Sequence, residues 1–279
     1  MNKQPRVSVL MTVFNADHHL GESLASLRQQ EFKDFEVIVL EHGSTDKSLK
    51  ILEAWDDHRL VLKTLERNIG RTQALNDCFS RANGEYIAIL DADDLAHPLR
   101  LDKEVQFLNE NTEVGLVGTW CQFIDDLDEE VGSSRPPVSH EKLIRQMAVR
   151  DPIVHSSMMF RRNIAVEIGG YDTSFVYAQD FNLLIEFARR TKIAVINEEL
   201  CVWRRSKSSL TASNELKITR AYDEFRLFKK VSASFDLGRV YRLLNLKQRM
   251  LTAAILMFAI RRSNLSVGIR KWSLQHGDK

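Results

Sequence analysis

The sequence has little of what marks disulfide-rich, zinc-binding or membrane-spanning proteins. Its 279 residues include three cysteines, Cys78, Cys121 and Cys201, with no Cys-x-x-Cys spacing, so neither a disulfide framework nor a zinc site is expected. No apolar run reaches the roughly 18 residues that a membrane-spanning helix needs. The first residues also lack the apolar core of a secretory signal. These absences predict a protein of the reducing cytoplasm.

Two glycine-rich phosphate-binding patterns are also missing. The turn after the first predicted strand lacks Gly-x-Gly-x-x-Gly, and Gly-x-x-x-x-Gly-Lys-Ser/Thr does not occur in the chain. The second absence excludes a P-loop, and the first weakens a dinucleotide-binding interpretation. The formal net charge of +1 gives no reason to expect nucleic acid as a partner. The length allows one large domain, or one domain with a smaller piece.

Strand-like and helix-like segments alternate through the first 95 residues. Apolar runs typical of buried strands occupy Val7–Phe14, Phe35–Leu40, Leu60–Leu65 and Tyr86–Leu90. Between them, apolar residues recur at helical spacing, as from Leu20 to about Gln30 and over Gln73–Ala82. This order predicts an α/β fold with a mainly parallel sheet and helices on both faces.

Polar residues gather where three of these strands end, at Asn15, at Glu41–Gly43 and at Asp91–Asp94. Ligands of such sheets lie at the carboxyl ends of the strands, so we expect these residues to lie together. Carboxylates this close repel one another unless a cation lies among them. The Asp-x-Asp pattern therefore predicts a divalent cation with oxygen ligands that would hold nucleotide phosphates. The alternative is an acidic turn that caps the next helix, a role expected of Asp94.

Beyond residue 95 the order of elements is less regular. Helices are expected over Pro98–Asn109, over His140–Val149 and from Gln179 onward. Strands are expected over Val114–Phe123, at Val195–Ile196 and over Cys201–Arg205, with a solvated hairpin tip at Asp125–Glu130 and a loop at Ser133–Pro137.

Five motifs, in this order and at these spacings, resemble glycosyltransferase family 2, whose enzymes have the GT-A fold. They are the strand ending Thr12–Val13–Phe14–Asn15, the turn Glu41–Asp46, Asn68–Gly70 with Ala74 and Asn76, Leu90–Asp94 with Arg100–Leu101, and Gly169–Asp172 with Gln179–Asp180. The resemblance covers roughly residues 6–212. Thr12–Ala16 and Ser157–Arg162 most resemble enzymes of bacterial surface polysaccharide or lipopolysaccharide synthesis.

The resemblance implies an inverting transfer of a sugar from a nucleotide diphosphate to a hydroxyl of a glycan, or of a lipid-linked acceptor, with Mn²⁺ or Mg²⁺ as cofactor. By position, Asp93 would ligate the cation, Asp91 would be shared between cation and ribose, and Asp180 would be the general base. The other residues implied at the donor are Thr12, Phe14 stacked on the base, Asn15, Glu41, His42, Arg71, Asn76 and Ala92.

Three positions depart from the family pattern. Phe14 stands where the family has a tyrosine, which keeps the ring for stacking and loses a hydroxyl. His42 replaces an aspartate near the nucleobase, so UDP, GDP and dTDP all remain open as donor nucleotides. Ser206 stands where a histidine often helps to hold the cation, so a third protein ligand is unsupported. His155 is an alternative polar residue for the floor of the site.

The motifs divide the chain into three parts. Residues 1–95 form a nucleotide-sugar-binding half, residues 96–213 an acceptor-binding half of the same domain, and residues 214–279 a helical extension. From Glu215 onward 14 Lys and Arg accompany 5 Asp and Glu. The extension therefore suits an anionic membrane surface at the inner face of the cell membrane. A packed helical extension and a dimer contact are the alternatives.

Two other functions are compatible with parts of this pattern. A nucleotide-sugar-binding protein without catalysis would explain the changes at His42 and Ser206, although Asp91, Asp93 and Asp180 are intact. A nucleotidyltransferase should carry a glycine-rich basic loop after its first strand, where this chain has Asn15–His19.

Overall fold

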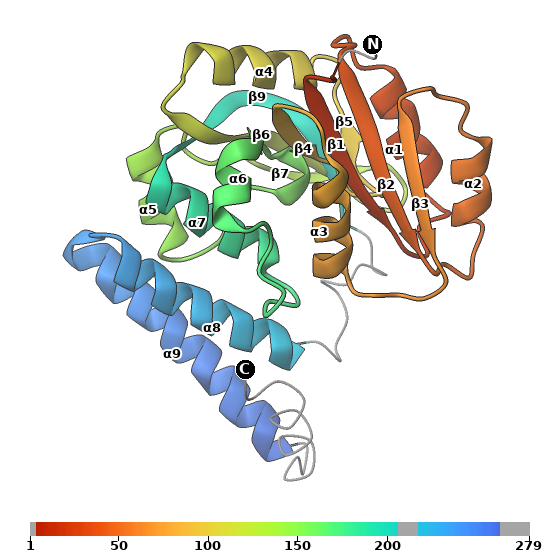
Figure 1. Cartoon of the computed structure of the whole chain (residues 1–279). Coiled ribbons are helices and arrows are strands. Elements are labelled where there is room, and N and C mark those ends of the chain that lie inside the picture. The colour runs from red at the N-terminus through yellow and green to blue at the C-terminus, as the bar shows by residue number, and fades with distance from the viewer. Residues whose placement is uncertain (1–3, 206–216, 263–279) are drawn as a thin grey trace.

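The computed structural model describes residues 4–205 and 217–262, in which one mixed nine-stranded sheet is flanked by helices (Figure 1). Its strands are β1 (Val7–Val13), β2 (Phe35–His42), β3 (Leu60–Leu65), β4 (Tyr86–Ile89), β5 (Leu95–Ala96), β6 (Val114–Ile124), β7 (Glu130–Ser134), β8 (Met159–Arg161) and β9 (Lys192–Arg204). The strand order is β3-β2-β1-β4-β8-β6-β9-β5, and β7 pairs with β6.

The helices are α1 (Leu20–Arg28), α2 (Ser48–Ala54), α3 (Arg71–Arg81), α4 (Arg100–Glu110), α5 (His140–Met147), α6 (Arg162–Ile168), α7 (Gln179–Arg190), α8 (Lys217–Ser234) and α9 (Gly238–Arg262), with a short 3₁₀ helix η1 (His155–Ser157). In the first half β1 runs parallel to β2 and β4, and β2 runs parallel to β3. The predicted parallel arrangement is confirmed there, and it brings the carboxyl ends of β1, β2 and β4 to one edge.

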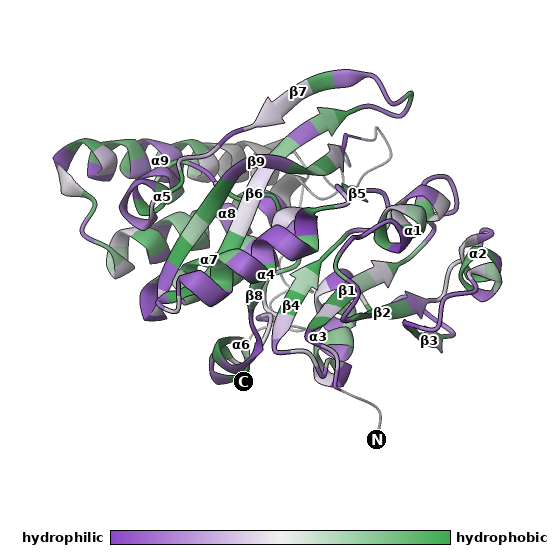
Figure 2. Cartoon of the chain, turned by 90° about the horizontal axis from the view of Figure 1, so that it is seen from above, coloured by the Kyte–Doolittle hydropathy of each residue, from purple (hydrophilic) through white to green (hydrophobic). Residues whose placement is uncertain are grey.

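The sheet buries an apolar layer on each face. Alternate residues of β1 point to opposite sides, so that Val9 packs with α1, α2 and α4, whereas Leu10 packs with α3, α5, α6 and α7. Figure 2 shows that the central strands β1 and β4 are largely hydrophobic, as strands covered on both faces should be.

The second half of the sheet is mixed and differs from prediction at several points, among them the short strands β5 and β8, which were not expected. The two strands expected between residues 195 and 205 are one strand, β9, which runs parallel to β6. Its polar middle, Asn197–Glu199, is exposed but still lies within the strand, where the register with β6 shifts. The expected loop at Ser133 is the end of β7, and α6 was not expected at all. The hairpin between β6 and β7 agrees with the predicted tip.

The C-terminal part forms two antiparallel helices beside the sheet (Figure 1). Leu227, Phe228 and Val231 of α8 are buried in the same apolar layer as α7. Packing of the extension on the domain is therefore confirmed for α8, and α9 lies on α8. None of the helices that the structure describes combines the length and apolar character needed to cross a bilayer.

Candidate active site

The loops that follow β1 and β2 are joined through Asn15. Its backbone N–H donates to Ser44 Oγ at 3.0 Å, and its Oδ1 accepts from the Thr45 N–H at 2.8 Å. Asn15 has a left-handed backbone, with φ of 50°, which asparagine adopts more readily than most residues. Asn15 thus lies at the expected edge and fixes both loops there. A contact between Asn15 and the donor stays a prediction.

Phe14 and His42 form a stacked aromatic pair at this edge. Their ring centroids are 5.5 Å apart and the ring planes differ by 25°. Phe14 is 41% exposed, whereas His42 is buried, and burial lowers the pKa of its imidazole. Near pH 7 the imidazole is therefore neutral. Its Nδ1 has no hydrogen-bond partner among the described residues. An exposed ring beside a neutral imidazole suits contact with a nucleobase.

Glu41 and Thr12 lie next to this pair. Glu41 is buried, and its Oε1 accepts from the Ser44 N–H at 2.6 Å, so it holds the turn between β2 and α2. Thr12 is half-buried in β1, beside Leu40 of β2. The structure thus brings the predicted donor residues of the first two strand ends together.

Asp91 is held by residues from two other segments. Arg71, the first residue of α3, places Nη2 2.5 Å from Asp91 Oδ2 and 3.0 Å from His155 Nδ1. The backbone N–H of Asp91 donates to Ser156 Oγ at 3.1 Å. Burial opposes ionisation of Asp91, but Arg71 and His155 outweigh it and hold the pKa of this carboxyl well below its usual range. Asp91 is therefore ionised and already paired.

Asp93 lies in a different environment. Burial and the nearby Asp91 carboxylate raise the pKa of Asp93 to about 6, which means that its charge lacks sufficient compensation from the protein. A divalent cation would supply it. No three His, Cys, Asp or Glu side chains within residues 4–205 and 217–262 are arranged to hold a metal ion by themselves. Asp93 and Asp91 offer two carboxylates to a cation, which would take its further ligands from elsewhere, such as substrate phosphate oxygens.

The expectation that Asp94 caps the next helix is wrong. Helix α4 begins six residues later, at Arg100, with Leu99 at its N-cap. Asp94 is buried, and its Oδ1 accepts from the backbone N–H of Arg204 at 2.8 Å. Burial together with Asp93 and Asp91 raises the pKa of Asp94 well above its usual range. Asp94 therefore joins the motif to β9.

Asp180, the second residue of α7, lies near the same cluster. Its Oδ1 accepts from the Phe181 N–H at 2.8 Å. Burial and then Asp180 raise the pKa of Tyr171 well above its usual range. Asp91 and Asp180, against the effect of burial, also raise the pKa of Arg71. The charges of Asp91 and Asp180 therefore both act on Arg71, an arrangement that suits a substrate placed near these residues.

The predicted donor residue Asn76 is bound to the acceptor half. Its Nδ2 donates to the Tyr171 carbonyl at 2.7 Å, and its Oδ1 accepts from the Tyr171 N–H at 2.8 Å. A side chain at Gly170 would come within 2.7 Å of that Oδ1, which explains the glycine. The Tyr171 hydroxyl lies 2.9 Å from His155 Nε2. A contact between Asn76 and the donor stays a prediction.

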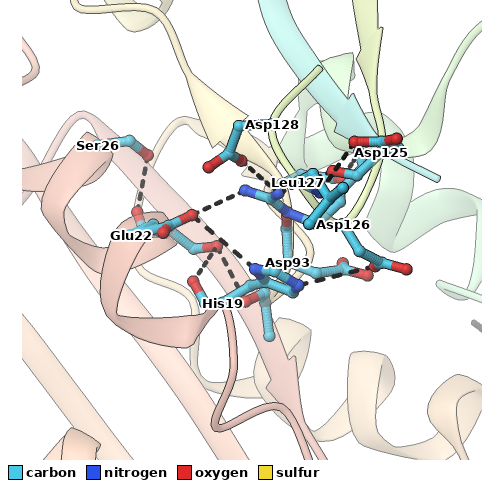
Figure 3. A network of polar contacts seen from close by, with 12 residues as sticks. His19, Glu22, Ser26, Asp93, Asp125, Asp126, Leu127 and Asp128 are labelled. Carbon is cyan, nitrogen blue, oxygen red and sulfur yellow. Dashed lines mark hydrogen bonds and ion pairs between the residues drawn. The ribbon is translucent and has the colours of Figure 1, made fainter. Parts of the chain in front are cut away.

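Sequence reasoning missed Ser156, Tyr171 and Arg204 as parts of this site. Tyr171 stood in a quoted motif, but nothing local indicated a bond to Asn76, 95 residues away. Arg204 was predicted only as part of the strand Cys201–Arg205, and Ser206 lies outside the described residues. Arg204 binds the Asp93 carbonyl, Asp128 and Glu22, and Figure 3 shows these three residues in one polar network.

Comparisons with known proteins identify the family of this chain. The model of a family described as "Glycosyl transferase family 2" matches residues 8–169. The glycosyltransferase MJ1057 of Methanocaldococcus jannaschii is 33% identical over 207 residues, which cover 72% of this chain and 71% of that protein. The β-1,3-glucosyltransferase WfgD of Escherichia coli is 26% identical over 86% of this chain and 91% of its own length.

Solved structures show the same fold. Residues 1–349 of TarS from S. aureus, in complex with UDP-GlcNAc, match with a TM-score of 0.68 at 18% identity, covering 94% of this chain and 76% of that one. The mannosyltransferase PcManGT of Pyrobaculum calidifontis, in complex with GDP-Man and Mn²⁺, matches with a TM-score of 0.61 at 19% identity, covering 98% and 81%. These likenesses confirm the expected GT-A type of fold.

Proposed function

Because this chain belongs to glycosyl transferase family 2 and is therefore a glycosyltransferase, we propose that it transfers a sugar from a nucleotide-diphosphate sugar, with inversion, to a hydroxyl of a glycan acceptor in bacterial polysaccharide or lipopolysaccharide synthesis. One observation carries this proposal. The Phe14–His42 pair and the Asp91–Asp93 motif lie at the carboxyl ends of β1, β2 and β4, at one edge of the sheet, and Arg71, which is bonded to Asp91, is also influenced by the charge of Asp180.

The donor would bind along the carboxyl ends of β1, β2 and β4. The exposed ring of Phe14 supplies stacking area for the base, and the neutral His42 can accept or donate a hydrogen bond to it. Structural neighbours bind UDP-GlcNAc and GDP-Man, so both nucleotides are candidates here, beside dTDP. Asp91 would meet the ribose or the cation, and Asp93 the cation.

The cation, Mn²⁺ or Mg²⁺, would stabilise negative charge that develops on the leaving diphosphate. Mn²⁺ is bound in the PcManGT complex. Asp180 would accept the proton of the acceptor hydroxyl, whose oxygen attacks the anomeric carbon from the side opposite the diphosphate. The bond between the anomeric carbon and the phosphate oxygen then breaks, and the nucleoside diphosphate leaves. Arg71 would orient Asp91 and balance the charge between it and Asp180.

The test begins with the donor and proceeds to the base. Thermal-shift measurements with UDP-, GDP- and dTDP-sugars, each with Mn²⁺, identify the donor by the largest rise in Tm. Asp180→Asn should then bind that donor within about threefold of the wild-type affinity and lower its turnover at least about 100-fold. Asp102→Asn, which changes an exposed carboxylate of α4, is the matched control and should behave as wild type.

Two results would contradict the assignment of Asp180. Loss of donor binding in Asp180→Asn would make the residue structural, since its Oδ1 also accepts the Phe181 N–H. Turnover equal to that of the Asp102→Asn control would place the general base elsewhere.

We further propose that the acceptor is lipid-linked and that α9 rests on the membrane that carries it, at its inner face. WfgD is named for an acceptor linked to diphosphoundecaprenol. Helix α9 contains no Asp or Glu, and its outer side has exposed apolar residues recurring at helical spacing. These are Val240, Leu243, Leu244, Met250 and Leu251, with the exposed Lys247 among them. A basic helix with such an apolar side suits the surface of an anionic bilayer.

A further inference from the structure

One buried arginine binds the Asp93–Asp94 part of the cation motif. Arg204 is the last residue of β9, and its side chain is 0% exposed. Its Nε donates to the Asp93 carbonyl at 3.2 Å, and its backbone N–H donates to Asp94 Oδ1 at 2.8 Å. Both the side chain and the main chain of Arg204 therefore bind the same two-residue segment of the motif.

The remaining nitrogens of the guanidinium bind two elements far apart in the sequence (Figure 3). Nη1 donates to Asp128 Oδ1 at 2.5 Å and to the Asp125 carbonyl at 3.1 Å, at the tip of the β6–β7 hairpin. Nη2 donates to Glu22 Oε2 at 2.7 Å, in the first turn of α1. All three nitrogens are thus engaged, in a planar fork that a lysine cannot reproduce.

This arrangement holds Asp93 through its carbonyl oxygen and not through a bond from Arg204 to its carboxylate. The neighbouring Ala92 carbonyl accepts from Ser23 Oγ at 2.9 Å, and the Asp91 side chain is bound to Arg71. Asp93 is instead held through its carbonyl, by Arg204. Because the carbonyl and the side chain of a residue share one Cα, fixing the former limits the directions open to the latter.

We propose that Arg204 is a positioning residue for the cation site: it holds the backbone of Asp93 in the orientation from which the carboxylate reaches the metal. This inference depends on the metal role of Asp93 stated under the proposed function. Substitution of residues that orient metal ligands typically lowers metal affinity 10- to 100-fold. The same magnitude is expected for Arg204→Lys, which keeps the positive charge but loses the fork.

The test compares Arg204→Lys with Arg161→Lys. Arg161, in β8, also clamps backbone carbonyls, those of Leu108 and Val114, but it pairs with the amino end of β4 rather than with the motif. The free Mn²⁺ signal in electron paramagnetic resonance gives the metal affinity, and hydrogen exchange of the amides of residues 90–96 reports the loop. Arg204→Lys should bind Mn²⁺ at least about 10-fold more weakly than wild type, and its amides in residues 90–96 should exchange faster. Arg161→Lys should do neither, even with a comparable loss of Tm.

The possible outcomes are separable. Wild-type affinity and exchange in Arg204→Lys would overturn the inference, and so would weaker binding with unchanged exchange, since Arg204 would then affect the metal without holding the backbone of Asp93. A wild-type protein that binds no Mn²⁺, either alone or with a nucleoside diphosphate present, would overturn the metal assignment of Asp93 itself, before any substitution is made. If Arg204→Lys does not fold, the variant Glu22→Gln/Asp128→Asn loosens the guanidinium in place, and weaker Mn²⁺ binding is expected there; unchanged binding would contradict the inference.

Discussion

At the scale of single residues, the two carboxylates of the cation motif have different environments. Asp91 is paired with Arg71, whereas Asp93 is left with burial and a like charge beside it, which raise its pKa to about 6. Asp93→Ala should therefore abolish Mn²⁺-dependent sugar transfer and leave the fold intact. Turnover measured with and without Mn²⁺, beside Asp102→Ala as control, checks this. Persisting metal-dependent turnover would assign the cation to other ligands.

Residues at the strand ends could be located from the sequence, but their long-range partners could not. Phe14, His42 and Asp91 follow apolar runs, and parallel strands bring such positions to one edge. Arg204 meets Asp93 across 111 residues, a pairing that no local pattern encodes. For Asp94 the prediction from the local pattern was wrong. An acidic residue shortly before a helix suggests a helix cap, whereas in the folded chain Asp94 is bonded to β9.

At the scale of elements, α8 is bound to the segment that leads to the predicted base. Asp223 Oδ2 accepts from the N–H groups of Val176 and Tyr177 at 3.0 and 3.1 Å. The Arg226 guanidinium lies 3.9 Å from the ring centroid of Phe175. Helix α8 therefore stabilises the approach to α7, which carries Asp180. The extension thus holds the segment before α7 and does not merely follow the domain in sequence.

A charged contact between α7 and α8 should make stability depend on pH. Burial opposes the charge of Glu186, but Lys230 and Arg190 outweigh it and lower the pKa of this carboxyl to about 2. A lowered pKa in the folded state adds stability above the unfolded value of 4.5 and loses it as the pH falls toward 2. At pH 7, Glu186→Gln should lower the free energy of unfolding by about 1 kcal/mol, which corresponds to about 2–4 °C in Tm.

The difference in Tm between wild type and Glu186→Gln should narrow as the pH falls from 5 toward 3, because protonation removes the same contact from the wild type. Thermal unfolding followed by circular dichroism at several pH values measures it. Glu224→Gln, which changes an i,i+4 pair on the surface of α8, should shift Tm little at any pH. A difference in Tm that does not vary with pH would show that the Glu186 charge is not what holds α8.

Helices and strands could be predicted where apolar residues follow a clear pattern in the sequence. They were harder to predict where pairing with a distant strand determines the structure. The first four strands came from uninterrupted apolar runs. Strand β9 was split in prediction because Asn197–Glu199 breaks the apolar pattern, yet the backbone of β9 remains paired with β6 on both sides of this segment. Polar side chains can point to solvent from a paired strand, so polarity alone did not mark a loop.

At the scale of the whole molecule, the charge and apolar surface are unevenly distributed. Residues from Glu215 onward carry a net excess of basic side chains in a chain whose total charge is only +1. The exposed apolar side of α9 lies away from α8, where Asn245 and Thr252 are buried. A second copy packed on this side would set basic residues against basic residues, with no acidic partner on α9. An anionic lipid surface would attract the basic side chains and would bury the exposed apolar ones.

The double variant Leu243→Glu/Met250→Glu should bind vesicles of anionic phosphatidylglycerol at least about 10-fold more weakly than wild type. Two apolar side chains would no longer enter the lipid interface, and two negative charges would face the anionic lipid. Flotation with vesicles gives the bound fraction, and phosphatidylcholine vesicles should bind poorly throughout. Val138→Glu/Val166→Glu makes the same change at two exposed valines of the domain and should bind as wild type. Equal vesicle binding by both double variants would contradict the membrane role, and a wild-type dimer dissociated by the α9 substitutions would show that α9 meets another copy.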